Sequence, residues 1–161
     1  VIMAKAKEYV CGYKHCLHAG EKVKQEEAKQ SGSRYYHPDC LQQKNNMNDV
    51  KNLYYEHISK TVVMKNLMKV INNIVLEKHI DSEYLLFAMK YVISNHMTLN
   101  SPYGLYYIID NKKIKSAWEK KKAKENERKI VEASKDVINN DVKFKLTLKE
   151  NDGFDRIFGG G

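Results

Sequence analysis

Two short stretches decide the fold of the N-terminal region: CGYKHC at residues 11–16 and YYHPDC at residues 35–40. Together they contain all three cysteines of the chain, within a window of 30 residues. The candidate ligands form two close pairs and are Cys11, Cys16, His37 and Cys40. Two such pairs, separated by about twenty residues, are typical of modules in which two short loops converge on one tetrahedral zinc ion. We therefore predict a Cys3His site that binds a structural Zn²⁺.

Three alternatives to this ligand set remain open from the sequence. A disulfide within the first pair would leave Cys40 unpaired, which fits poorly with a secreted scaffold. Three unrelated buried thiols would be expected to scatter over the chain. His15 or His18 could replace His37, although the two-residue spacing between His37 and Cys40 favours His37. A closed set of four ligands leaves no open coordination position, so we expect a structural rather than a catalytic ion.

Length and composition limit the class of protein. A chain of 161 residues is long enough for one modest hydrophobic core and a small metal module. Its hydrophobic content of 42% argues against global disorder. No apolar run approaches the about eighteen residues of a membrane span. An odd number of thiols without a recognisable secretory leader predicts a reducing cytoplasm.

We expect a mainly α fold in three parts. They are a zinc-finger module at 1–46, a helical bundle with a long basic C-terminal helix at 47–138, and a strand-like segment with a flexible tail at 139–161. Apolar residues recur at helical spacing over 63–79, 81–96, 101–109 and 114–137. The amide-rich segment 41–50 fits either a linker or the frayed start of a helix.

Several residues predict where these helices begin and end. Asp81 has the position and side chain of an N-cap, and 101–102 is a serine and proline pair typical of a helix start. The pair 110–111 is expected to break or kink the chain, and 139–141 to end the last helix. Over 142–148, apolar residues alternate with lysine and threonine, which predicts a strand.

The segment 112–129 carries most of the positive charge. The chain has a net charge of +8, and this segment alone has nine basic residues against three glutamates, an excess of +6. The nine are Lys112, Lys113, Lys115, Lys120, Lys121, Lys122, Lys124, Arg128 and Lys129. Such a segment suits the phosphate backbone of nucleic acid or an acidic protein surface. The alternative is a solvated helix with i,i+4 ion pairs, such as Glu125 with Lys129.

Other residues are candidates for binding a partner. Tyr13, Tyr35 and Tyr36 lie near the metal ligands and could stack on unpaired bases, although tyrosines near a zinc site more often pack over it. At the C-terminus, Phe154 and Phe158 bound a segment with the composition of a docking peptide for a host protein. A flexible tail is the alternative there.

Two parts of the chain resemble known families. The ligand set, with Tyr36 directly before His37, resembles the Cys3His fingers of the poly(ADP-ribose) polymerase type. That resemblance covers about a quarter of the chain and implies binding to DNA breaks through backbone contacts and stacking, although the first ligand pair here is C-x4-C instead of C-x2-C. Residues 53–118 resemble the helical DnaD-type domain of bacterial and phage replication-initiation proteins, through 81–86 and 100–103.

The sequence contains no phosphate-binding glycine loop and no recognisable catalytic motif. We therefore expect a non-enzymatic zinc-containing nucleic-acid-binding accessory protein, which holds phosphate backbone through the finger and the basic helix. The lysine- and asparagine-rich composition suggests a phage or mobile-element product in the cytoplasm of a Gram-positive bacterial host. The alternative is a phage inhibitor protein, of the anti-CRISPR or another anti-defence type, that binds a host nucleic-acid enzyme.

Overall fold

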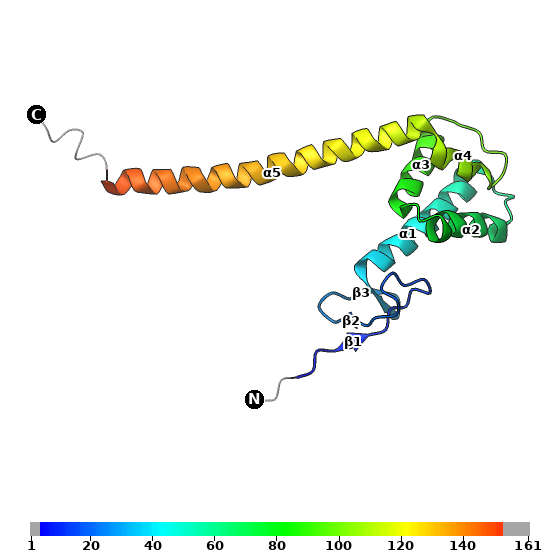
Figure 1. The fold of residues 1–161 in the computed structure, drawn as a ribbon, viewed down its shortest axis with the longest axis horizontal. Coiled ribbons are helices and arrows are strands. Elements are labelled where there is room, and N and C mark those ends of the chain that lie inside the picture. The colour runs from blue at the N-terminus through cyan, green and yellow to red at the C-terminus, as the bar shows by residue number, and fades with distance from the viewer. Residues whose placement is uncertain (1–3, 153–161) are drawn as a thin grey trace, which may run out of the picture. The chain divides into compact units, whose positions relative to one another are not determined.

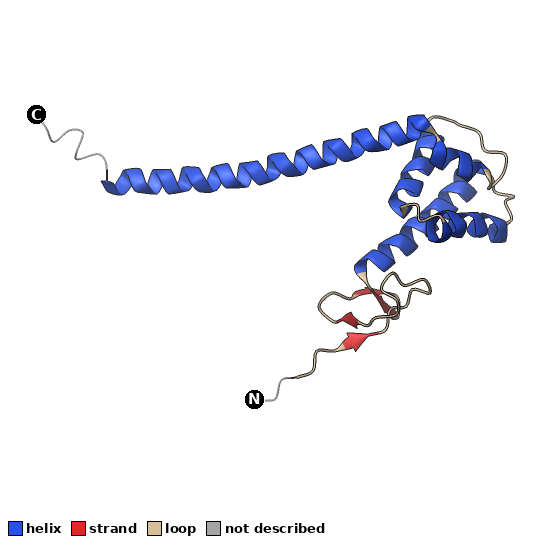
Figure 2. Ribbon diagram, viewed as in Figure 1, coloured by secondary structure: helices blue, strands red, loops and turns tan. Residues whose placement is uncertain are grey.

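The computed structural model describes the backbone of residues 4–152 and the side chains of residues 4–136. The described chain is mainly helical, as predicted, with two small sheets near its N-terminus (Figure 1, Figure 2). Its residues group into two compact units, Val1–Lys115 and Ser116–Gly161. The first unit contains the cysteines and the hydrophobic core, and the second contains most of one long helix.

The N-terminal module is built from two short antiparallel hairpins. Strand β1 (Glu8–Tyr9) pairs with β2 (Val23–Lys24), and β3 (Lys29–Ser31) pairs with β4 (Arg34–Tyr36). Gly32 opens the two-residue loop between β3 and β4 with φ +62°, a conformation that glycine adopts at no steric cost. No pattern in the sequence predicted these hairpins.

Helices form the rest of the first unit. In chain order they are α1 (Pro38–Leu53) with a π-helical end η1 (Tyr54–Ile58), α2 (Met64–Asn72) with a π-helical end η2 (Asn73–Glu77), α3 (Ser82–Ser94) and α4 (Gly104–Asp110). Helix α1 packs against α2 and α3, and α3 packs against α4. The core between them includes Leu67, Ile71, Leu85, Met89 and Leu105, all fully buried. The helices predicted at 63–79 and 81–96 are confirmed.

Segment 41–50 lies within α1, so the helical interpretation of this amide-rich stretch is correct. Pro38 at the helix start and Asp39 in the first turn favour a helix that begins here. The amides then bind the neighbouring helix α3. Asn46 Nδ2 donates to Ser82 Oγ at 3.1 Å, and Gln42 donates to the Glu83 carboxylate at 2.7 Å.

The predicted helix boundaries are confirmed at two of three positions in the first unit. Asp81 caps α3, since its carboxylate accepts a hydrogen bond from the Glu83 N–H at 2.9 Å. Asn111 separates α4 from the last helix, and its side-chain oxygen accepts from the Lys113 N–H at 2.9 Å. The start predicted at 101–102 is wrong. A turn closed by the Gly104 N–H donating to the Ser101 carbonyl precedes α4, which begins at Gly104.

The last helix, α5 (Lys112–Asp152), is continuous over 41 residues. At 1.5 Å per residue it is about 60 Å long. The expected end at 139–141 and the expected strand at 142–148 are therefore wrong. A strand needs a neighbour to accept its backbone hydrogen bonds, whereas a helix satisfies its own, and leucine and lysine favour helices. The predicted docking segment at 154–158 lies outside the described residues. No helix of the described chain is long and apolar enough to cross a membrane.

Candidate metal centre

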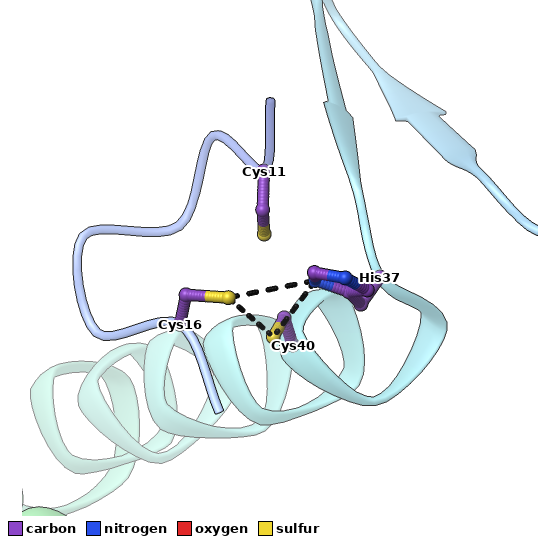
Figure 3. Close-up of side chains that lie close together, drawn as sticks. All are labelled: Cys11, Cys16, His37 and Cys40. Atoms are coloured by element: carbon purple, nitrogen blue, oxygen red, sulfur yellow. Dashed lines mark hydrogen bonds between the residues drawn. The ribbon is translucent and has the colours of Figure 1, made fainter. Parts of the chain in front are cut away.

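The four predicted ligands come from two places in the N-terminal module. Cys11 and Cys16 lie in the loop that follows β1, and His37 and Cys40 lie at the start of α1. His37 is the extended N-cap residue of α1, and Cys40 follows it by one turn, so both side chains point to the same side of the helix. Figure 3 shows the sulfur of Cys11 directed toward the other three side chains.

The distances between the ligand atoms match a tetrahedral zinc site. His37 Nδ1 lies 3.5 Å from Cys16 Sγ and 3.8 Å from Cys40 Sγ, and the two sulfurs are 3.9 Å apart. With Cys11 included, all four ligand atoms lie within 4.8 Å of one another. Tetrahedral zinc with Zn–S of about 2.3 Å and Zn–N of about 2.05 Å places neighbouring sulfurs about 3.8 Å apart and sulfur and nitrogen about 3.6 Å apart. These residues therefore fit a structural Zn²⁺.

The structure also separates the alternatives for the thiols and the histidine. All three cysteines are free thiols, so no disulfide forms within the first pair. His37 is 8% exposed and directs Nδ1 at the sulfurs. His18 instead binds the Asp39 carboxylate, with Nε2 at 2.8 and 2.9 Å from its oxygens. His15 is exposed and lies edge-on to Tyr13, with ring centroids 5.8 Å apart.

Backbone N–H groups donate to two of the three sulfurs. The Leu17 N–H donates to Cys40 Sγ at 3.3 Å. Burial works to raise the pKa of the Cys16 thiol, but hydrogen bonds from the His18 and Gly20 N–H groups and from the Cys40 and Cys11 thiols together outweigh it and lower that pKa. Burial raises the pKa of the Cys40 thiol to about 12, despite the Leu17 N–H. A bound cation is the kind of charge that holds such a buried thiol deprotonated, which suits a metal ligand.

A histidine and carboxylate pair, His18 and Asp39, flanks the ligands and was not predicted from the sequence. The His18 ring packs on the His37 ring, with centroids 4.0 Å apart. Asp39 accepts from His18 and also from the Cys40 N–H at 2.9 Å, so it ties the first loop to the start of α1. The hydrogen bond to Asp39 raises the pKa of His18. The pair fixes the orientation of two of the four ligands.

The three predicted stacking tyrosines differ in their surroundings. Tyr35 is half-buried and stacks on Tyr9, with centroids 3.8 Å apart and an interplanar angle of 11°. Tyr36 is buried beneath Lys44, whose Nζ lies 4.7 Å from the ring centroid and donates to the hydroxyl at 3.1 Å. Tyr13 is half-buried, and its hydroxyl donates to Met47 Sδ at 3.5 Å. The ring of Tyr36 therefore packs within the protein.

The nine predicted basic residues all lie in α5, and most are exposed. Lys121 and Lys122 lie 4.0 and 3.7 Å from the Glu125 carboxylate, so the ion pairs of Glu125 run to these residues and not to Lys129 as suggested by the sequence. Lys122 also lies over the Trp118 ring, 4.6 Å from its centroid. Because successive residues of a helix are about 100° apart, the charges surround α5 and do not form one stripe.

Comparison with known proteins found no matching family model, no matching curated protein and no matching solved structure. The resemblances to poly(ADP-ribose) polymerase fingers and to DnaD-type domains therefore rest on the residues alone. The arrangement that the structure does show is a Cys3His group at distances suited to a metal ion.

Proposed function

We propose that this protein is a non-enzymatic, zinc-containing nucleic-acid-binding protein, in which zinc folds the N-terminal module and α5 holds the phosphate backbone. The observation that carries the proposal is the charge of α5. Between Lys112 and Lys129, nine cationic side chains accompany three glutamates on a helix whose side chains are mostly exposed. A polyanion is the partner that neutralises such a density of charge most completely.

The zinc part of the proposal rests on how little the module buries. Among residues 4–40, the buried side chains are Val23, Tyr36, His37 and Cys40, and two of these are metal ligands. The hairpins have only two or three residues in each strand. Burial of so small a core does not offset the entropy lost when the loops become ordered. The bound ion would therefore supply the remaining free energy of folding. Four protein ligands leave no open position for catalysis.

The phosphate-binding part rests on unpaired cations. Six of the nine basic side chains have no carboxylate within ion-pair distance among the side chains that the structure describes. These six are Lys112, Lys113, Lys120, Lys124, Arg128 and Lys129. Surface cations that lack an internal partner can neutralise phosphates of a nucleic acid, and the counterions condensed on those phosphates are then released, which drives binding. Since the charges surround the helix, we expect affinity for the backbone without strong preference for sequence.

Binding of labelled DNA and RNA, measured by fluorescence anisotropy at several salt concentrations, tests this function. Six to ten phosphate contacts would weaken binding about 10³- to 10⁵-fold between 50 and 200 mM salt. The triple variant Lys120→Gln/Lys124→Gln/Arg128→Gln should reduce the salt dependence. A control with equal charge loss elsewhere, Lys5→Gln/Lys60→Gln/Lys90→Gln, should change it less.

A change in affinity of less than threefold over this salt range would contradict the proposal. The inhibitor hypothesis predicts a different result in the same preparation. There the protein would form a stoichiometric complex with a host protein that survives nuclease treatment, and it would show no measurable affinity for DNA or RNA.

A further inference from the structure

We propose that the first unit contains a second nucleic-acid site, a groove between the zinc module and α2 that holds an unpaired, single-stranded segment. The inference rests on the proposed function, since it assumes that the protein binds nucleic acid. It adds a site that is formed by residues of the first unit and that selects for accessible bases.

The groove consists of two adjoining hollows. One has a volume of about 740 Å³ and the other about 550 Å³, and they adjoin at His15, Met68 and Asn72, which line both. One wall is formed by α1 and the loop that carries the first two candidate zinc ligands, and the other is α2 with its π-helical end. At its far end the groove reaches Tyr103, directly before α4.

The charge of the groove suits a phosphate backbone. Three lysines line it, Lys44, Lys65 and Lys69, against one carboxylate, Glu77, which leaves an excess of two positive charges. Lys65 and Lys69 are exposed and one helical turn apart, and neither has a carboxylate within ion-pair distance among the described residues. Phosphates spaced along one strand can therefore reach both cations.

The groove is also rich in side-chain amides. Five asparagines line it: Asn45, Asn48, Asn66, Asn72 and Asn73. Asn73 accepts from the Tyr106 hydroxyl at 3.0 Å, whereas the amides of the other four have no hydrogen-bond partner among the described side chains. An amide offers a donor and an acceptor side by side, which matches the edge of an unpaired base.

Aromatic rings lie at both ends of the groove. Tyr103 is 63% exposed, and Tyr106 beside it is half-buried with Lys78 over its ring, 4.8 Å from the centroid. Tyr13 lies at the other end, and His15 lies where the two hollows adjoin. Bases stack on such rings only when they are unpaired, so rings and amides together favour a single strand over a duplex. An acidic peptide would use the lysines but not this set of amides and rings.

The test measures binding of the full-length zinc-loaded protein to oligonucleotides of about 12 nucleotides, a length within the range covered by single-strand-binding folds. The four oligonucleotides are single-stranded DNA, single-stranded RNA, a duplex of the same sequence, and an abasic strand of equal charge. Lys65→Gln/Lys69→Gln should lower the slope of log affinity against log salt for single strands by about 1.4, for two lost phosphate contacts. Lys60→Gln/Lys90→Gln is the matched control.

Tyr103→Ala tests the stacking. It should weaken binding of both natural single strands at least about fivefold, as expected when one stacked base is lost. It should leave the abasic strand unaffected, a result that a purely structural defect would not give. Tyr55→Ala, at another exposed tyrosine, is the control and should stay within twofold of the wild type. Equal affinity for single-stranded DNA and RNA would mean that the groove recognises the bases and phosphates that both share. Unequal affinities would identify the strand that the groove prefers.

The outcomes separate this site from the function it rests on. If the wild-type protein binds none of the four oligonucleotides, the proposed function and the groove are both overturned. If the wild type binds and the α5 variant loses affinity, while the groove variants match their controls, the groove alone is refuted. Loss of single-strand binding in the groove variants, with duplex binding retained, supports the groove.

Discussion

Replacement of His37 by alanine removes one of the four candidate ligands without adding a new group. Structural zinc in small peptides binds with an apparent free energy of about 10–16 kcal/mol. If the four ligands contribute equally, loss of one costs about 2.5–4 kcal/mol, which corresponds to zinc binding about 70- to 900-fold weaker. The structure places His37 among the ligands, because its Nδ1 lies at 3.5 and 3.8 Å from two of the sulfurs.

Competition with a chromophoric chelator at fixed pH gives these affinities. His15→Ala is the matched control, since it removes an exposed histidine from the loop that carries Cys11 and Cys16. Its zinc affinity should stay within threefold of that of the wild type. His18→Ala should fall between the two, about tenfold weaker, because outer partners such as the His18 and Asp39 pair only orient the ligands.

The ranking of the zinc affinities of the three variants tests which histidine is the ligand. If His15→Ala weakened zinc binding as much as His37→Ala is expected to, the assignment of the ligand would be wrong. Equal, small effects of all three would mean that no histidine contributes to the site.

Further predictions concern folding. Chelation of the metal should remove hydrogen-exchange protection from the hairpins at 8–36 and leave that of α3 intact, because the core of the helices lies outside the module; loss of protection throughout would contradict this. Leu85→Ala should cost about 2–5 kcal/mol in urea unfolding, since the side chain is fully buried, and a cost below 1 kcal/mol would mean that it does not pack as described. Asp81→Ala should cost about 0.5–2 kcal/mol by loss of the α3 cap, whereas Asp81→Asn should retain most of the stability.

The sequence predicted those features that local physics determines. Apolar residues at helical spacing located α2 and α3, because burial of one face is what holds such helices in place. Asp81 could be recognised as a cap because its bond to the Glu83 N–H spans only two residues. The grouping of the four ligands followed from the narrow preferences of zinc.

Features set by long-range contacts could not be predicted in this way. The hairpin strands are short and largely polar, so no alternating pattern predicts them. The turn at Gly32 and the convergence of the ligands bring the strands together. Asn46 fits either a linker or the start of a helix in the sequence, because its hydrogen-bond partner Ser82 lies 36 residues away. The groove likewise joins His15 and Tyr103, which lie far apart in the chain. At 142–148, alternation indicated a strand, but the segment lies in α5, and a helix satisfies its own backbone hydrogen bonds without a neighbouring strand.

The metal content of the purified protein decides whether the N-terminal module is a zinc module. Native mass spectrometry, with elemental analysis of the same sample, should find one zinc ion per chain, and the three thiols should resist alkylation until a chelator is added. A metal-free protein with alkylatable thiols, whose hairpins at 8–36 are nevertheless protected from hydrogen exchange, would contradict a module folded by zinc.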